Sequence, residues 1–315
     1  MTPPSIDLHQ HLWPEPLLAA LSRRTEPPML VRRGEAWHVR TPGEPDVPVV
    51  LADHDPDARL ALLARHGVDQ AVIAPSVPLG IEALDADAAA QLLAAYHEGA
   101  AALPSGLRAW AAVGLAEPDP AGLARLLDGG FAGACVAADA LSGPEGYDHL
   151  GPVLRVLEDR GAPLFVHPGP SPRTLAAGDG AVGAERPSWW PAVTTHIASM
   201  HGAWHAFVAF GRPAHPGLRV CFAMLAGLAP LQRERLVARG GPRVSDPDVF
   251  VDTSSYGAHA IDAVIRELGV DRLVLGTDVP VIGFAEPALG DAVALAVRVR
   301  NPARLLTHTP PGAPA

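Results

Sequence analysis

The stretch DPDARLALLARHGVDQAVIAP, residues 55–75, shows the pattern that decides the fold. Asp55 and Pro56 form a pair that can cap and start a helix, and Gly67 can end it. The run QAVIAP follows at 70–75 and is apolar without alternation, which is typical of a strand buried on both faces. The stretch therefore predicts one helix–strand unit of a parallel α/β protein.

The same unit recurs along the whole chain. Strands are expected at 5–11, 70–75, 107–113, 133–138, 162–167, 218–223, 249–254 and 272–277. Helical patterns are expected at 55–67, 85–103, 120–130, 147–161, 191–210, 230–240 and 258–269. Repeated units of this kind close most naturally as a (β/α)8 TIM barrel, whose active sites lie at the carboxyl ends of the strands. An open doubly wound sheet is the alternative, weakened because no Gly-x-Gly-x-x-Gly follows the first strand.

Two segments do not follow the repeated strand–helix pattern. Residues 27–50 predict a small β-hairpin inserted after the first strand. Residues 168–190 are rich in Gly and Pro and predict an active-site loop after the fifth strand. No linker divides the chain, so residues 1–315 are expected to form one barrel domain.

The composition of the chain excludes several classes of binding partner and of reaction. The chain is 48% hydrophobic and 18% charged, with a formal net charge of −10 and no basic cluster, which argues against nucleic acid. No apolar run reaches the ~18 residues of a membrane span. Cys135 and Cys221 lie in apolar, strand-like runs and suggest buried thiols in a reducing compartment, so we expect a cytoplasmic protein. All 24 basic residues are arginine, which excludes Schiff-base chemistry and a Walker A loop, because both need lysine.

Chemistry-bearing residues follow three of the predicted strands. His9 and His11 are two residues apart in SIDLHQH, so a strand directs both to the same side. His167 ends LFVH, and Asp278 follows VLGT. Three imidazoles and a carboxylate form a donor set suited to Zn²⁺ with one open position. Each residue taken alone has a plainer explanation, as an exposed or loop histidine or a helix-capping aspartate.

With these motifs the sequence resembles the amidohydrolase superfamily, and within it the branch that contains 2-amino-3-carboxymuconate-6-semialdehyde decarboxylase. The resemblance extends from DLHQH near the start through VFVDTSS and RLVLGTDVPVIG to NPARLL. It implies one divalent metal, most simply Zn²⁺, held by His9, His11, His167 and Asp278, with Asp278 also accepting a proton. It further implies a homodimer and the non-oxidative decarboxylation of a small unsaturated or aromatic carboxylic acid. Two-metal relatives use a carboxylated lysine on the fourth strand, and its absence favours a single metal.

One position departs from this branch. The branch typically has His-Gly-Gly after the sixth strand, and its histidine transfers protons, whereas this chain has FAMLAGLAP with Met224 in that place. A thioether cannot carry a proton. His196, His201 and His205 on the expected helix at 191–210 are candidates to replace it. His201 and His205 share a helix face and could also form a metal pair or belong to ordinary packing.

Further residues are candidates for substrate contact. Arg59 and Arg235 fall near positions where the branch places arginines that hold carboxylates, although each could be a helix-surface residue. Trp189 and Trp190 could line a pocket or plug the space beneath the loop, and Met224 is a further candidate for the pocket lining. Two alternatives stay open. One is metal-dependent hydrolysis of an amide, imide, ester or lactone, and the other is a catalytically degenerate barrel that only binds.

Overall fold

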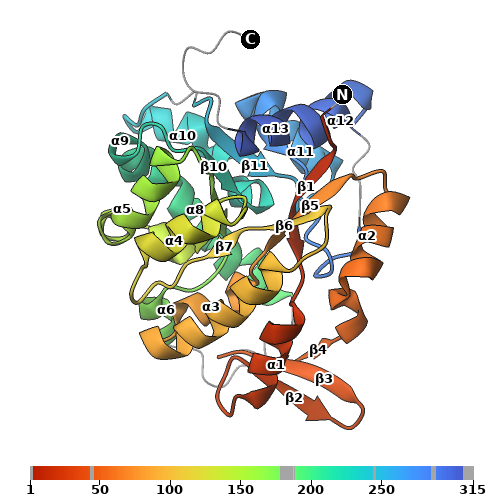
Figure 1. The fold of residues 1–315 in the computed structure, drawn as a ribbon. Coiled ribbons are helices and arrows are strands. Elements are labelled where there is room, and N and C mark those ends of the chain that lie inside the picture. The colour runs from red at the N-terminus through yellow and green to blue at the C-terminus, as the bar shows by residue number, and fades with distance from the viewer. Residues whose placement is uncertain are drawn as a thin grey trace.

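Parallel strands surround the centre of the protein, and helices cover their outer side (Figure 1). The computed structural model describes residues 3–42, 46–177, 187, 189–243, 246–284 and 289–307. The central strands are β1 (Ile6–His11), β5 (Gln70–Ala74), β6 (Leu107–Ala109), β7 (Ala111–Ala112), β8 (Ala134–Ala137), β9 (Leu164–His167), β10 (Val220–Phe222), β11 (Val249–Asp252) and β12 (Leu273–Val274).

Two hydrogen-bonded sheets, β1–β5–β6 and β12–β11–β10–β9–β8–β7, join at both edges. At one junction β6 and β7 are one continuous strand, interrupted only at Trp110. At the other, the Leu8 N–H donates to the Leu275 carbonyl over 2.8 Å, and the Asp278 N–H donates to the His9 carbonyl over 2.8 Å. The strands therefore close into an eight-stranded barrel, which confirms the predicted (β/α)8 class and excludes the open sheet.

Helices alternate with the strands as the sequence pattern predicts. They are α2 (Pro56–Arg65), α3 (Ala86–Ala101), α4 (Pro120–Asp128), α5 (Pro144–Asp159), α8 (Thr195–Ala206), α10 (Arg233–Ala238), α11 (Ala258–Leu268), α12 (Asp291–Leu295) and α13 (Asn301–Leu306). Asp55 caps α2 by accepting the N–H groups of Asp57 and Ala58, and Asp119 caps α4 in a similar way. The Asp-Pro pairs therefore start these helices.

The interior of the barrel is packed with large side chains below the strand ends. Trp110, Phe165 and Phe250 are almost completely buried. The rings of Trp110 and Phe165 stack with centroids 5.1 Å apart, and Phe165 meets His9 edge-on at 5.1 Å. This apolar layer forms the floor on which the residues at the carboxyl ends of the strands rest.

The predicted insertion is larger than a hairpin. A three-stranded antiparallel sheet of β2 (Met29–Arg33), β3 (Ala36–Arg40) and β4 (Val47–Val49) follows α1 (Glu15–Arg23). In Figure 1 it lies at the lower end of the barrel, beyond the end of β1. The active-site loop predicted at 168–190 contains α6 (Pro172–Ala177), while residues 178–186 and 188 lie outside the described residues.

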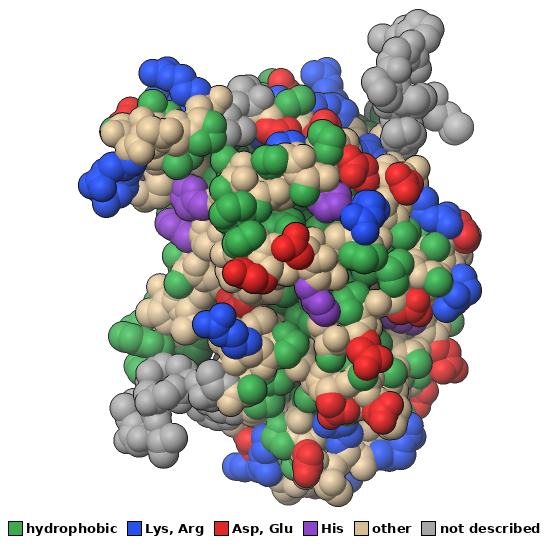
Figure 2. Space-filling view, turned by 90° about the vertical axis from the view of Figure 1, so that its left-hand side faces the viewer, with side chains coloured by type: hydrophobic (Ala, Val, Ile, Leu, Met, Phe, Trp, Pro, Cys, Tyr) green, Lys and Arg blue, Asp and Glu red, His purple; other side chains and the backbone are tan. Residues whose placement is uncertain are grey.

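The helix expected at 191–210 is broken. It consists of α7 (Trp190–Val193), α8 and a π-helical turn at Phe207–Gly211, and α9 (Arg212–Ala214) continues it. Among the described residues, no helix has both the length and the apolar character required to cross a bilayer. Acidic and basic side chains are interspersed over the face shown in Figure 2.

Candidate metal centre

Four side chains from distant parts of the chain meet at the carboxyl end of the barrel. They are His9, His11, His167 and Asp278, all buried, and one ligand atom from each lies within 4.8 Å of the others. Nε2 of His9 is 3.2 Å from Nε2 of His11 and 3.1 Å from Nε2 of His167. Oδ1 of Asp278 is 3.1 Å from Nε2 of His11. The structure thus brings together the four residues that the sequence predicts as metal ligands.

The backbone explains why these side chains converge. Strand alternation places His9 and His11 on one face of β1, and His167 is the last residue of β9. Asp278 has a φ of 61°, a left-handed conformation that aspartate tolerates better than most residues. Its N–H is bonded to the His9 carbonyl, so the turn after β12 is fixed directly to β1.

Hydrogen bonds at the far ring nitrogens orient the three imidazoles. Nδ1 of His11 lies 3.1 Å from a carbonyl oxygen of β5, and Nδ1 of His167 lies 2.8 Å from the carbonyl of the next residue. Because a carbonyl oxygen only accepts, both Nδ1 atoms carry hydrogen, and Nδ1 of His9 donates to Asp252 over 2.7 Å. The Nε2 atoms are therefore left as inward-facing acceptors beside a carboxylate. That donor set fits a divalent metal ion.

Asp252, at the end of β11, is a member of this site that the sequence prediction missed. Its Oδ2 holds His9, while its Oδ1 accepts hydrogen bonds from the Met224 N–H, 2.9 Å away, and from the N–H and hydroxyl of Ser254, at 2.9 and 2.5 Å. Gly276 leaves room for it, since a Cβ there would lie 2.7 Å from the Asp252 carboxyl carbon. The signal was a buried aspartate ending the apolar run VFVD, next to the strand of Asp278.

The pKa values of the clustered side chains are shifted in different directions. Burial lowers the pKa of His9, but the charges of Asp252 and Asp278 outweigh burial and raise it to about 9. Burial, with His9 and His11 nearby, holds the pKa of His167 well below its usual value. Burial raises the pKa of Asp278, but the hydrogen bond and charges of the imidazoles outweigh it and hold that pKa well below its usual range. The cluster therefore favours one positive charge at its centre, either a proton on Nε2 of His9 or a metal ion that replaces this proton.

A comparison with known families agrees with this geometry. A family model described as amidohydrolase matches residues 6–306. The chain belongs to the amidohydrolase family. No curated protein sequence matches it.

Several solved structures share the amidohydrolase fold with this chain. The apo form of IDCase from Metarhizium anisopliae is 19% identical with a TM-score of 0.71, over 96% of this chain and 97% of that chain. The 5-carboxyvanillate decarboxylase LigW from Sphingomonas paucimobilis is 18% identical with a TM-score of 0.68, over 97% and 99%. The 5-carboxyvanillate decarboxylase from Novosphingobium aromaticivorans, complexed with manganese and 4-hydroxy-3-methoxy-5-nitrobenzoic acid, is 15% identical with a TM-score of 0.68, over 96% and 95%. These identities establish a common fold.

The two arginines predicted to hold substrate occupy different environments in this amidohydrolase. Arg59 is buried, and its guanidinium donates to the Gln10 side chain and to the carbonyl oxygens of His11 and Asp53, at 2.8–3.0 Å. It connects the end of β1 to the segment before α2. Arg235 is exposed on α10.

The predicted pocket-lining residues also differ in exposure. Trp189 and Trp190 are 57% and 38% exposed, so neither ring is buried beneath the loop. Met224 is buried, and its N–H reaches the carboxylate that holds His9. Met224 is therefore connected to the cluster through Asp252.

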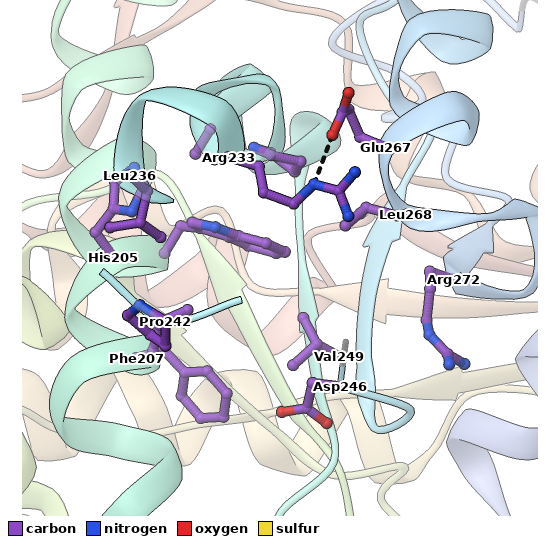
Figure 3. Close-up of a pocket in the computed structure, with 14 residues that line it drawn as sticks. His205, Phe207, Arg233, Leu236, Pro242, Asp246, Val249, Glu267, Leu268 and Arg272 are labelled. Atoms are coloured by element: carbon purple, nitrogen blue, oxygen red, sulfur yellow. Dashed lines mark ion pairs between the residues drawn. The ribbon is translucent and has the colours of Figure 1, made fainter. Parts of the chain in front are cut away.

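The three helix histidines make different contacts, and the rings of His201 and His205 meet edge to face with centroids 6.4 Å apart. The imidazole Nε2 of His201 donates to the Gly227 carbonyl over 2.6 Å and so ties α8 to the segment after β10. His205 lines a pocket with Arg233 and Glu267, which form an ion pair at 2.8 Å (Figure 3). His196, at the start of α8, is half-buried, and burial lowers its pKa while the charge of Asp278 raises it.

Proposed function

We propose that this chain is a metal-dependent, non-oxidative decarboxylase of a small unsaturated or aromatic carboxylic acid. The orientation of the imidazole nitrogens is the main support for this proposal. Three imidazoles present Nε2 toward one another and toward Asp278, while the Nδ1 atoms of His11 and His167 donate to fixed carbonyl oxygens. A divalent cation is the group that this arrangement accommodates best, and Zn²⁺ suits its nitrogen and oxygen ligands.

The metal, Asp278 and His196 have different roles in the proposed reaction. A bound divalent metal supplies a Lewis acid that polarises the substrate. Asp278 is an ionised carboxylate and is our candidate proton acceptor. Its other oxygen lies 3.4 Å from the Ser255 hydroxyl. Loss of CO₂ leaves a carbon that must gain a proton. His196 is our candidate donor, because it lies in the first turn of α8, the helix that packs on the Met224 segment.

Fold relatives support the reaction class. Solved structures of this fold include 5-carboxyvanillate decarboxylases, one of them with manganese bound. Because the identities are low, they leave the acid to be found by experiment. Contact between the substrate and Arg59, Arg235, Trp189 or Trp190 stays a prediction.

Carbon dioxide release tests the proposal. The metal-loaded protein is incubated with unsaturated and hydroxylated aromatic acids, and CO₂ and products are measured, with the protein stripped by chelator as the control. We expect CO₂ from at least one acid, and only with metal. An absence of CO₂ from every acid tested would contradict the proposal.

Hydrolysis is the second candidate, favoured by Met224 in the position where a proton-transferring histidine was expected. A metal site with one carboxylate base can hydrolyse an amide, imide, ester or lactone without that histidine. Reactions in ¹⁸O-labelled water separate the two: label in the product with no loss of carbon indicates hydrolysis.

We also propose that residues 1–315 form one barrel domain, with 27–50 and 168–190 as its insertion and active-site loop. The free, buried thiols of Cys135 and Cys221 support a cytoplasmic location. A homodimer is proposed from the family resemblance alone, and sedimentation analysis would test it.

A further inference from the structure

A fourth histidine lies near the metal centre and is not one of its proposed ligands. His54 is 9% exposed and ends the short 3-10 helix Leu51–His54, which precedes α2. Its imidazole stacks on the Trp13 indole, with ring centroids 4.7 Å apart and planes within 11°. Trp13 comes two residues after His11, so the His54 ring packs against the end of the strand that carries two of the proposed ligands.

The protonation of His54 is fixed by the backbone. The Trp13 N–H donates to Nδ1 of His54 over 3.0 Å, so Nδ1 carries no hydrogen and the neutral ring carries it on Nε2. Burial, with the charges of Arg59 and His11 nearby, lowers the pKa of His54 to about 4, which keeps the ring neutral near pH 7. His54 therefore offers a single hydrogen-bond donor, Nε2–H.

Neighbouring contacts hold the ring rigidly. Arg59 binds both the Asp53 and the His11 carbonyl oxygens, at 2.8 and 3.0 Å, and so fixes the residue before His54 to the end of β1. The Trp13 indole N–H donates to the Ser76 hydroxyl over 2.8 Å, which fixes the ring under His54.

The Nε2–H group makes no hydrogen bond in the part of the chain that the structure describes, and it is not among the polar atoms there that are closed off from solvent. It therefore donates to water, or to a ligand that displaces that water. We propose that His54 is a substrate-positioning residue, whose Nε2–H donates to a second oxygen of the acid, such as a ring hydroxyl. The inference rests on the proposed function and narrows its substrates to acids that carry such an oxygen in addition to the carboxylate.

Two substitutions separate this role from a structural one. His54→Asn places an acceptor where Nδ1 lies and so keeps the Trp13 contact, but it removes the distal donor. His54→Gln places an N–H group where Nε2 lies and loses the Trp13 contact. A purely structural role is therefore preserved by Asn, whereas the substrate-positioning role is preserved by Gln.

Calorimetric titration of the metal-loaded proteins tests the inference. The probes are 2,6-dihydroxybenzoate, 5-carboxyvanillate and 4-hydroxy-3-methoxy-5-nitrobenzoate, with benzoate as the reference that has only a carboxylate. We expect His54→Asn to bind the hydroxylated acid that the wild type prefers about 3- to 10-fold more weakly, the equivalent of one hydrogen bond, with benzoate unchanged. His54→Gln is expected to stay within about 3-fold of the wild type. Melting temperature and metal content check that both variants are folded and loaded.

The outcomes are distinguishable. If His54→Asn binds the preferred acid as tightly as the wild type, or if only His54→Gln binds it weakly, the positioning role is wrong while the proposed function stands. If the metal-loaded wild type binds none of the hydroxylated acids, this inference is wrong, whereas the proposed function fails only if no acid releases CO₂.

Discussion

Asp252 is the residue through which the protein controls a proposed metal ligand without contacting the metal. Its carboxylate holds Nδ1 of His9 at 2.7 Å and is itself fixed by Met224 and Ser254. Because it orients His9 and increases the basicity of its ring, we predict that Asp252→Asn weakens Zn²⁺ binding by about 10- to 100-fold. Competition with a chromophoric chelator measures this. Asp262→Asn, on the exposed side of α11, is the control, and equal affinities for both variants would contradict the assignment.

Glu82 gives a pH dependence of stability with a definite sign. Burial raises the pKa of this carboxyl to about 7, and its Oε2 has no partner among the described residues. Between about pH 4.5 and 7 the unfolded chain ionises Glu82 while the folded chain keeps it protonated, so the free energy of unfolding falls as the pH rises. Glu82→Gln removes that loss. Its stability relative to the wild type is expected to rise by up to about 3 kcal/mol from pH 4.5 to pH 8.

Urea unfolding at the two pH values measures the Glu82 effect. Glu98→Gln, at an exposed position of α3, is the matched control. A constant difference between Glu82→Gln and the wild type over this pH range would show that the buried carboxyl titrates normally.

His196 and His205 allow a paired test of the proton donor. If His196 protonates the product, His196→Gln lowers kcat for CO₂ release by about 100-fold or more. His205→Gln keeps the wild-type rate, because His205 lines the pocket of Figure 3 and not the metal centre. Equal rates for the two variants would exclude His196.

The sequence predicts the four clustered residues because each lies at or just after the carboxyl end of a predicted strand, in a recognisable motif. Asp252 and His54 escaped prediction for physical reasons. The role of Asp252 depends on a contact with His9 across 243 positions in the chain. The fixed tautomer of His54 depends on the backbone N–H of Trp13, which no side-chain pattern reveals.

The segment after β10 has the most unusual backbone conformation among the described elements. Met224, Leu225, Ala226, Gly227 and Leu228 all have φ between 49° and 65°, so they form a left-handed turn of mostly non-glycine residues. The apolar sequence gave no indication of this conformation. Such backbone is strained and persists only where its surroundings hold it, and here it places the Met224 N–H on the Asp252 carboxylate.

A substitution at Gly227 tests how tightly the left-handed turn is packed. A Cβ at Gly227 would lie 3.1 Å from the Ile197 carbonyl and 3.2 Å from the Met200 Cβ, and its φ of 60° disfavours other residues. Gly227→Ala is therefore expected to destabilise the protein by about 1–3 kcal/mol. Gly257→Ala is the control, because nothing lies within 4 Å of its Cβ position. Equal denaturation midpoints for the two variants would contradict a tightly packed turn.

Most elements follow the sequence pattern because apolar strands and Asp-Pro caps are local signals. The segment at 191–210 does not, since its break into α7, α8 and a π-helical turn depends on packing against other elements. The third strand of the insertion was missed for a similar reason. Val47–Val49 is short and becomes a strand by pairing with β3.

At the scale of the whole molecule, barrel closure creates the site. β1 and the segment after β12 lie at opposite ends of the chain and are joined by backbone hydrogen bonds, which bring His9 and His11 to Asp278. A metal bound there connects β1, β9 and the turn after β12, and it binds the folded state alone. We therefore predict that Zn²⁺ at about 100 times its Kd stabilises the fold by about 2.7 kcal/mol and raises the melting temperature by several degrees.

The increase in melting temperature caused by Zn²⁺ is expected to depend on pH. Protons compete with the metal for the imidazoles, so the increase in melting temperature is expected to shrink as the pH falls. Magnesium at the same concentration is the control, because it prefers oxygen ligands. A melting temperature that does not change with Zn²⁺ at neutral pH would show that the cluster binds no metal of this kind.

Elemental analysis of the purified protein tests the central claim most directly. The wild type, His11→Ala and His205→Ala are each loaded with Zn²⁺, dialysed and measured for metal per chain. We predict one ion per chain in the wild type and in His205→Ala, and none in His11→Ala. A wild-type protein without metal, or a His11→Ala variant that retains the full amount, would contradict this prediction.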